Sequence, residues 1–124
     1  MQIGARCQRG DLRLEVEEGV PLPGCNELLA ITVAYREAYE AEFGHLDLSG
    51  VRVRFRASVF VMDGGFTGHT YSDAIDIGQH QWQDVPHELN HVRTGPGHDG
   101  WCLDYEPWSE AVLGIDQRAY LGCP

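Results

Sequence analysis

The chain has 124 residues, 43% of them hydrophobic, which fits one domain, residues 1–124, with a core of its own. Nineteen acidic residues stand against nine basic ones, all of them arginine, and the net charge of −10 argues against a nucleic-acid partner because phosphate would be repelled. No apolar run of about 20 residues is present, so no membrane span is expected.

The first two-thirds of the sequence predict three strands and a long helix. Residues 12–16 alternate apolar and charged side chains, as a half-buried strand does. Residues 26–43 carry apolar side chains at helical spacing and are followed by Gly44, which can end a helix. Residues 51–61 show the strongest alternation in the chain, and residues 71–77 show a weaker one that suits a strand with one exposed edge.

Three arginines, Arg52, Arg54 and Arg56, alternate along the strand predicted at 51–61. Alternation places them on one face of that strand, and we expect this face to be solvated. A binding site for carboxylate or phosphate groups is the less favoured alternative.

The most informative segment is His87-Glu88-Leu89-Asn90-His91. In an α-helix, residues i and i+4 lie on the same face, so the two imidazoles can bind one metal ion. Glu88 projects beside that face and can accept a proton from water without being a ligand. A helix is expected here because Asp84 can cap it, Pro86 suits its first turn and Gly95 can end it.

A third metal ligand has to come from beyond this helix, because catalytic zinc usually has three protein ligands. His98 is the preferred candidate, since the turn after the helix can bring it back toward the metal. Glu110 is the main alternative, on a possible short helix at 106–113. Three further carboxylates remain open: Asp99, Glu106 and Asp104. Asp99 can instead orient one of the histidines as a hydrogen-bond partner.

Residues 87–101 resemble the zincin superfamily of metallopeptidases, most closely its SprT-like, WLM and YgjP-like branches. In those branches a His-Glu-Leu-x-His helix is followed by a third histidine and soon by an aromatic residue, and here these are His98 and Trp101. The resemblance implies bound Zn²⁺ with three ligands and a general base: His87, His91, His98 and Glu88. Beneath the metal we expect a small core: Trp101, Leu103 and Trp108.

The element order matches a zincin-like α+β fold, with a twisted sheet of about three strands backed by a long helix, the metal helix beside it and an irregular C-terminal tail. In such proteins the edge strand before the metal helix often binds an extended substrate by backbone pairing. Here that strand would comprise Tyr71, Ser72, Asp73, Ala74, Ile75, Asp76 and Ile77. The implied substrate is a peptide or an unstructured protein segment, although a tail that covers this edge is an equal alternative.

The implied activity is peptide hydrolysis, in which zinc polarises the scissile carbonyl and Glu88 carries a proton from water to the leaving amine. Several side chains are candidates for oxyanion stabilisation: Tyr105, His69, Tyr71 and Arg93. Three other functions remain open. They are a non-catalytic zinc-binding module closed by a fourth ligand such as Asp99, a zinc amidase or deaminase acting on a small molecule, and a histidine pair that binds no metal.

Four cysteines with wide spacing predict two disulfides. Of the three possible pairings, Cys7 with Cys25 and Cys102 with Cys123 is favoured because each bond ties a terminus to the body of the domain. Closing a loop of about 20 residues stabilises the fold by roughly 3 kcal/mol. Disulfides persist in oxidising compartments, so we expect a secreted or periplasmic protein in its mature form, without a signal peptide, rather than a cytosolic protein with reduced thiols.

Overall fold

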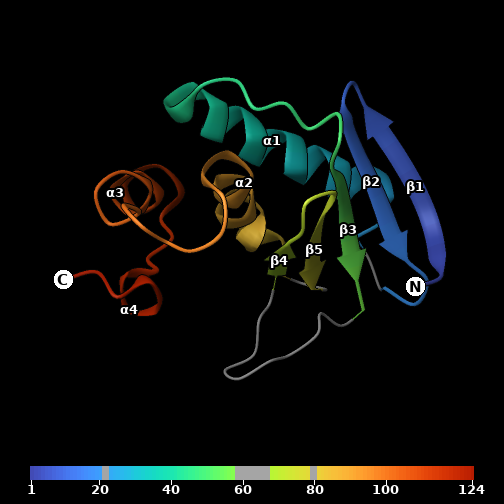
Figure 1. The fold of residues 1–124 in the computed structure, drawn as a ribbon. Coiled ribbons are helices and arrows are strands. Elements are labelled where there is room, and N and C mark those ends of the chain that lie inside the picture. The colour runs from blue at the N-terminus through green and yellow to red at the C-terminus, as the bar shows by residue number, and fades with distance from the viewer. Residues whose placement is uncertain (21–22, 58–67, 79–80) are drawn as a thin grey trace.

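A five-stranded mixed sheet in the order β1-β2-β3-β5-β4 organises the computed structural model, which describes residues 1–20, 23–57, 68–78 and 81–124 (Figure 1). The strands are β1 (Ile3–Arg9), β2 (Leu12–Glu17), β3 (Arg52–Arg56), β4 (Gly68–Thr70) and β5 (Ala74–Gly78). β1 and β2 form an antiparallel hairpin, β2, β3 and β5 run parallel, and β4 returns antiparallel to β5. With its helices on one side, this sheet makes a small α+β domain.

The sheet is larger than the three strands expected from the sequence. β2 and β3 lie where alternation predicts them, but the prediction misses β1 and β4. In β1 the half-buried positions hold Ile3, Ala5 and Cys7, so its inner face has little apolar volume to produce a pattern. β4 has only three residues, which is too short for any periodicity. The end of the strand predicted at 51–61 lies outside the described residues.

The prediction that residues 71–77 form an edge strand is wrong. The strand begins at Ala74 and is hydrogen-bonded on both sides, to β3 and to β4. All five residues of β5 are buried, including Asp76, which is 1% exposed. Its carboxylate is paired with Arg54 and Arg56 instead of being solvated, so an apparently polar position belongs to an interior strand. Within the described residues, the outermost strand at this side of the sheet is β4.

The two faces of β3 differ as the alternation predicts. Val53 and Phe55 are buried, while the arginines between and beside them are half-buried on the other face. Each arginine pairs with a carboxylate on a neighbouring strand, and these pairs are Arg52–Glu15, Arg54–Asp76 and Arg56–Glu17. The expectation of a solvated face is therefore only partly met, because these arginines are half-buried and each forms an ion pair within the sheet.

Two helices cover the core. α1 (Cys25–Phe43) lies across the sheet, and α2 (Val85–Thr94), which follows the short η1 turn (Trp82–Asp84), lies between the sheet and the C-terminal helices (Figure 1). A buried polar contact joins the two helices: Tyr39 Oη donates to Asn90 Oδ1 at 2.7 Å, and Arg93 Nε donates to Tyr39 Oη at 2.6 Å. This contact fixes the helix that carries the histidine motif. No helix within the described residues is long and apolar enough to span a bilayer.

The C-terminal segment is helical where an irregular tail is expected. It forms α3 (Tyr105–Trp108), the π-helical turn η2 (Ser109–Leu113) and α4 (Arg118–Leu121). Both favoured disulfides are present, Cys7–Cys25 and Cys102–Cys123. The first joins β1 to the start of α1, and the second joins the segment after His98 to the residues that follow α4. Two disulfides fit an extracellular or otherwise oxidising compartment.

Candidate metal centre

Helix α2 presents the histidine motif toward the C-terminal helices. Pro86 lies in the first turn, where its missing N–H costs nothing, and Gly95 ends the helix with φ of +87°, a conformation that favours glycine. Leu89 is fully buried, which sets the rotation of the helix. His87 and His91 consequently lie on the same face, one turn apart.

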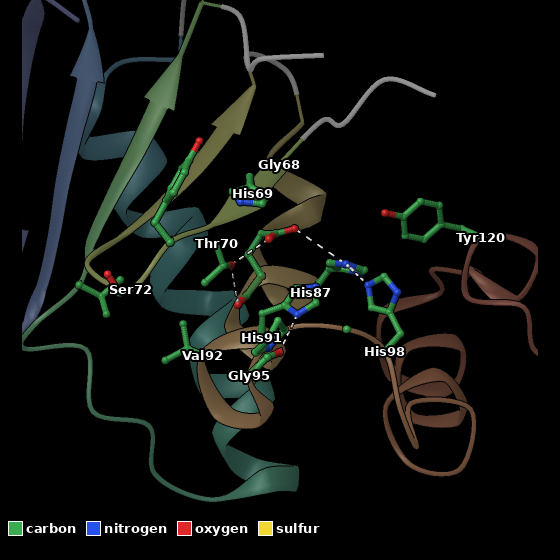
Figure 2. Close-up of a pocket in the computed structure, with 15 residues that line it drawn as sticks. Gly68, His69, Thr70, Ser72, His87, His91, Val92, Gly95, His98 and Tyr120 are labelled. Carbon is green, nitrogen blue, oxygen red and sulfur yellow. Dashed lines mark hydrogen bonds and ion pairs between the residues drawn. The ribbon is translucent and has the colours of Figure 1, made fainter. Parts of the chain in front are cut away.

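Three imidazoles gather at this face. One ring nitrogen from each of His87, His91 and His98 lies within 4.8 Å of the others, so the group can hold a metal ion. The Nε2 atoms of His87 and His98 are 3.3 Å apart. The ring of Trp101, which is 1% exposed, contacts all three imidazoles with ring centroids 4.6 to 4.7 Å apart. Trp101 thus forms the floor of the group, and Figure 2 shows His98 reaching toward His87 from the loop after α2.

Hydrogen bonds orient two of the rings through their second nitrogen. His91 Nδ1 lies 3.0 Å from the Gly95 carbonyl oxygen, which can only accept, so this nitrogen carries the proton and Nε2 keeps its lone pair. His87 Nδ1 lies 2.9 Å from Gln117 Oε1, an acceptor that favours the same tautomer. Partners of this kind fix ring orientation at metal sites.

Burial keeps these imidazoles neutral near pH 7. It lowers the pKa of His87 to about 4, and it is also the main cause of the lowered pKa values of His91 and His98. A neutral imidazole is the form that binds a metal ion. The protein thus presents three ligands without first having to remove a proton from them.

Glu88 lies beside the histidines without joining them. The residue is 4% exposed, Oε1 accepts a hydrogen bond from Thr70 Oγ1 at 2.8 Å, and Oε2 is 3.9 Å from His87 Nε2. Burial raises the pKa of Glu88 to about 7, against the opposing effect of the Thr70 hydroxyl. β4 comes close here: a Cβ at Gly68 would lie 3.2 Å from Glu88 Oε2, so the glycine leaves room for the carboxylate.

The group opens into a cavity of about 520 Å³ between β4 and α4. His69 lines the side next to the sheet and Tyr120 lines the opposite side (Figure 2), and Tyr71 is also a lining residue. Tyr71 and Tyr120 are 44% and 58% exposed, so solvent reaches this cavity from its rim. The ring of Tyr120 lies 5.8 Å from that of His87 and 5.6 Å from that of His98.

The structure separates the candidates for the third ligand. His98 joins the pair on α2, whereas Glu110 lies in a different group, formed with Glu106 and Asp116. Asp99 is exposed and lies in neither group, and the carboxylate of Asp104 accepts a hydrogen bond from the backbone N–H of Tyr105 at the start of α3.

The other expected side chains lie at different distances from the histidine group, and the ring centroid of Tyr105 is 6.3 Å from that of His87. Tyr105 is 1% exposed and packs on Trp101 and Trp108, so it belongs to the core instead of the cavity, and burial raises its pKa. Leu103 is 87% exposed, so its expected place in that core is wrong. His69 lines the cavity from β4.

Four residues at the site escape the sequence prediction: Gly68, Thr70, Gln117 and Tyr120. They lie well before and after the motif in the chain, and tertiary contacts such as the pairing of β4 and the Cys102–Cys123 bond bring them to it. No spacing rule connects such segments to a helix motif. Their types, a small residue, a hydroxyl, an amide and a phenol, are also common in ordinary loops.

The sequence matches no protein-family model, and no curated protein or solved structure is significantly similar to it. Function must therefore be argued from the chemistry of these side chains.

Proposed function

We propose that this protein is a zinc-dependent peptidase of the zincin type, in which His87, His91 and His98 bind Zn²⁺ and Glu88 is the general base. The observation that carries the proposal is the pairing of a three-imidazole group with a buried, hydrogen-bonded carboxylate at the side of an open cavity. A structural metal site has no need of such a carboxylate.

The donor set fits zinc. Neutral imidazole is a preferred zinc ligand, and three of them with an open position are typical of catalytic sites. Two nitrogens bound to one tetrahedral zinc at about 2.0–2.1 Å lie roughly 3.3 Å from each other. The Nε2 atoms of His87 and His98 have that separation, 3.3 Å. Hydrogen bonds at Nδ1 of His87 and His91 agree with coordination through the other nitrogen.

The bound metal would act as a Lewis acid that polarises the scissile carbonyl and acidifies water. Glu88 accepts the proton of the attacking water and later gives it to the leaving amine, as a general base and then acid must. Its pKa of about 7 suits both transfers, and a nearby cation would lower this value by favouring the carboxylate. The Thr70 hydroxyl holds one carboxylate oxygen, which leaves Oε2 on the side of His87.

Two features favour catalysis over a closed zinc-binding module. Among the described residues, no fourth histidine, cysteine or carboxylate joins the group, and Asp99, the candidate for closing it, is exposed. The cavity also extends to the rim formed by Tyr71 and Tyr120, which suits a peptide segment better than a small molecule enclosed on all sides. We expect the substrate to lie along β4, the strand that replaces residues 71–77 at the edge, and the net charge of −10 favours basic peptides.

The test combines metal analysis with cleavage of an unfolded protein by wild type, Glu88→Gln and His91→Ala. We expect one zinc per chain in wild type and Glu88→Gln, loss of zinc in His91→Ala, and a cleavage rate about 10²- to 10⁴-fold lower in Glu88→Gln. Glu42→Gln, which removes an exposed charge on α1, is the matched control and should cleave normally.

Each failure has a distinct meaning. Glu88→Gln that cleaves as fast as wild type refutes the role of Glu88, even if zinc is present. A folded, zinc-loaded wild type that leaves unfolded proteins intact supports the amidase or the non-catalytic module. A protein without metal refutes the proposal as a whole.

A further inference from the structure

A second group of ligand-type side chains lies on the C-terminal side of the histidines. Glu106 comes from α3, Glu110 from η2 and Asp116 from the segment before α4. One carboxylate oxygen from each lies within 4.8 Å of the others. The group contains no nitrogen or sulfur donor, so its chemistry differs from that of the histidine centre.

Glu106 is the member of this group with an unsatisfied carboxylate oxygen. The residue is 2% exposed, and Oε1 accepts a hydrogen bond from the backbone N–H of Gln117 at 3.0 Å. Oε2 is buried and has no hydrogen-bond partner among the described residues. Burial, and next the neighbouring Glu110 carboxyl group, raise the pKa of Glu106. A buried carboxylate oxygen without a donor is unfavourable, so this position requires a positive charge or a proton.

The nearby arginine compensates only part of the charge. Arg118 Nε is 3.5 Å from Glu110 Oε1, and its Nη2 is 3.0 Å from Asp116 Oδ2. Within the described part of the chain, no ion pair reaches Glu106. One guanidinium against three carboxylates leaves two negative charges when all three are ionised, which is the charge that a divalent cation would neutralise.

We propose that Glu106, Glu110 and Asp116 form a site for Ca²⁺, separate from the histidine centre. Ca²⁺ is a hard cation that takes oxygen ligands in flexible geometry and completes its shell with water, whereas Zn²⁺ favours the imidazoles. Mg²⁺ fits less well because it demands near-ideal octahedral geometry.

The proposed calcium site supports the histidine centre through one residue. Gln117 follows Asp116 directly, its N–H donates to Glu106 and its side-chain oxygen contacts His87 Nδ1. A cation bound by all three carboxylates holds α3 and η2 against the segment that carries Gln117. Calcium therefore stabilises the segment that carries Gln117 and orients His87. Calcium binding can be measured whether or not the protein cleaves peptides.

The experiment is a calorimetric titration of the full, zinc-loaded chain with CaCl₂ in calcium-free buffer, together with Tm measured with and without calcium. We expect one Ca²⁺ per chain and a higher Tm. Asp116→Asn should weaken binding about tenfold or more, because calcium affinity follows the charge of the ligands. Tb³⁺ provides a spectroscopic check, since Trp108 lies two residues from Glu106 and can sensitise its emission.

Matched variants decide the outcome. Asp116 is exposed, so its substitution should leave Tm in calcium-free buffer unchanged, and Glu110→Gln is the second variant if it does not. Glu42→Gln removes the same charge on α1 and should bind calcium as wild type does. The proposal is overturned if wild type binds no Ca²⁺, or if Glu42→Gln weakens binding as much as Asp116→Asn. Either result would mean that Glu106 and Glu110 share a proton instead of binding a cation. Zinc content, measured on the same sample, tests the histidine centre independently.

Discussion

Replacing Gln117 by leucine should weaken zinc binding without removing a ligand. The substitution deletes the acceptor 2.9 Å from Nδ1 of His87, a residue that is 6% exposed. A buried donor left without a partner costs about 1–3 kcal/mol, which corresponds to roughly 5- to 150-fold in affinity. Losses of about 10- to 100-fold are usual when such a partner is removed from a metal-binding histidine.

A chromophoric chelator that competes for zinc measures this affinity. Gln117→Glu is the conservative control, because it keeps an acceptor at the same place and should bind zinc at least as tightly as wild type. Both variants keep the hydrogen bond from the backbone N–H of residue 117 to Glu106 Oε1, because it does not involve the substituted side chain. A zinc Kd for Gln117→Leu within about twofold of wild type would show that the amide does not orient His87.

Two further predictions concern β4 and the first hairpin. Gly68→Ala should retain zinc but slow cleavage by about tenfold to a hundredfold. The reason is that its Cβ would lie 3.2 Å from Glu88 Oε2 and 3.3 Å from the Asp76 carbonyl oxygen. An unchanged cleavage rate at full zinc content would contradict this prediction. Arg36 holds the pKa of Asp11 well below its usual range. The contribution of this ion pair to the stability of the folded protein is therefore complete above about pH 4 and is lost as the pH falls further. Urea unfolding at pH 7 should therefore give Asp11→Asn a lower free energy of unfolding than wild type, and this difference should shrink toward pH 2. A difference that is constant with pH would refute the role of the ion pair.

The parts of the fold that the sequence predicts correctly are those with a strong local pattern. α1 has a long helical period that ends at Gly44, and β2 and β3 alternate clearly. The prediction fails at β5, which is an interior strand. Asp76 has the polarity of an exposed position, yet Arg54 and Arg56 neutralise it inside the sheet. A pattern cannot reveal a charge that is paired by residues 20 positions away.

The candidate site also contains residues that the sequence predicts and residues that it does not. His87 and His91 follow from helix geometry, and His98 is close enough in sequence for a turn to return it. Thr70 and Gln117 contact the site because tertiary structure brings distant segments of the chain next to α2. Side chains that could hold a metal ion can therefore be found from spacing, whereas the hydrogen bonds that orient them depend on tertiary structure.

The contact of Trp101 with all three imidazoles gives the protein a fluorescent reporter of its own. Because the indole is buried against the rings, a cation arriving among them changes the electric field at this chromophore and should shift or quench its emission. Metal uptake can thus be followed in real time on the unlabelled chain, with Trp101→Phe separating this signal from those of Trp82 and Trp108.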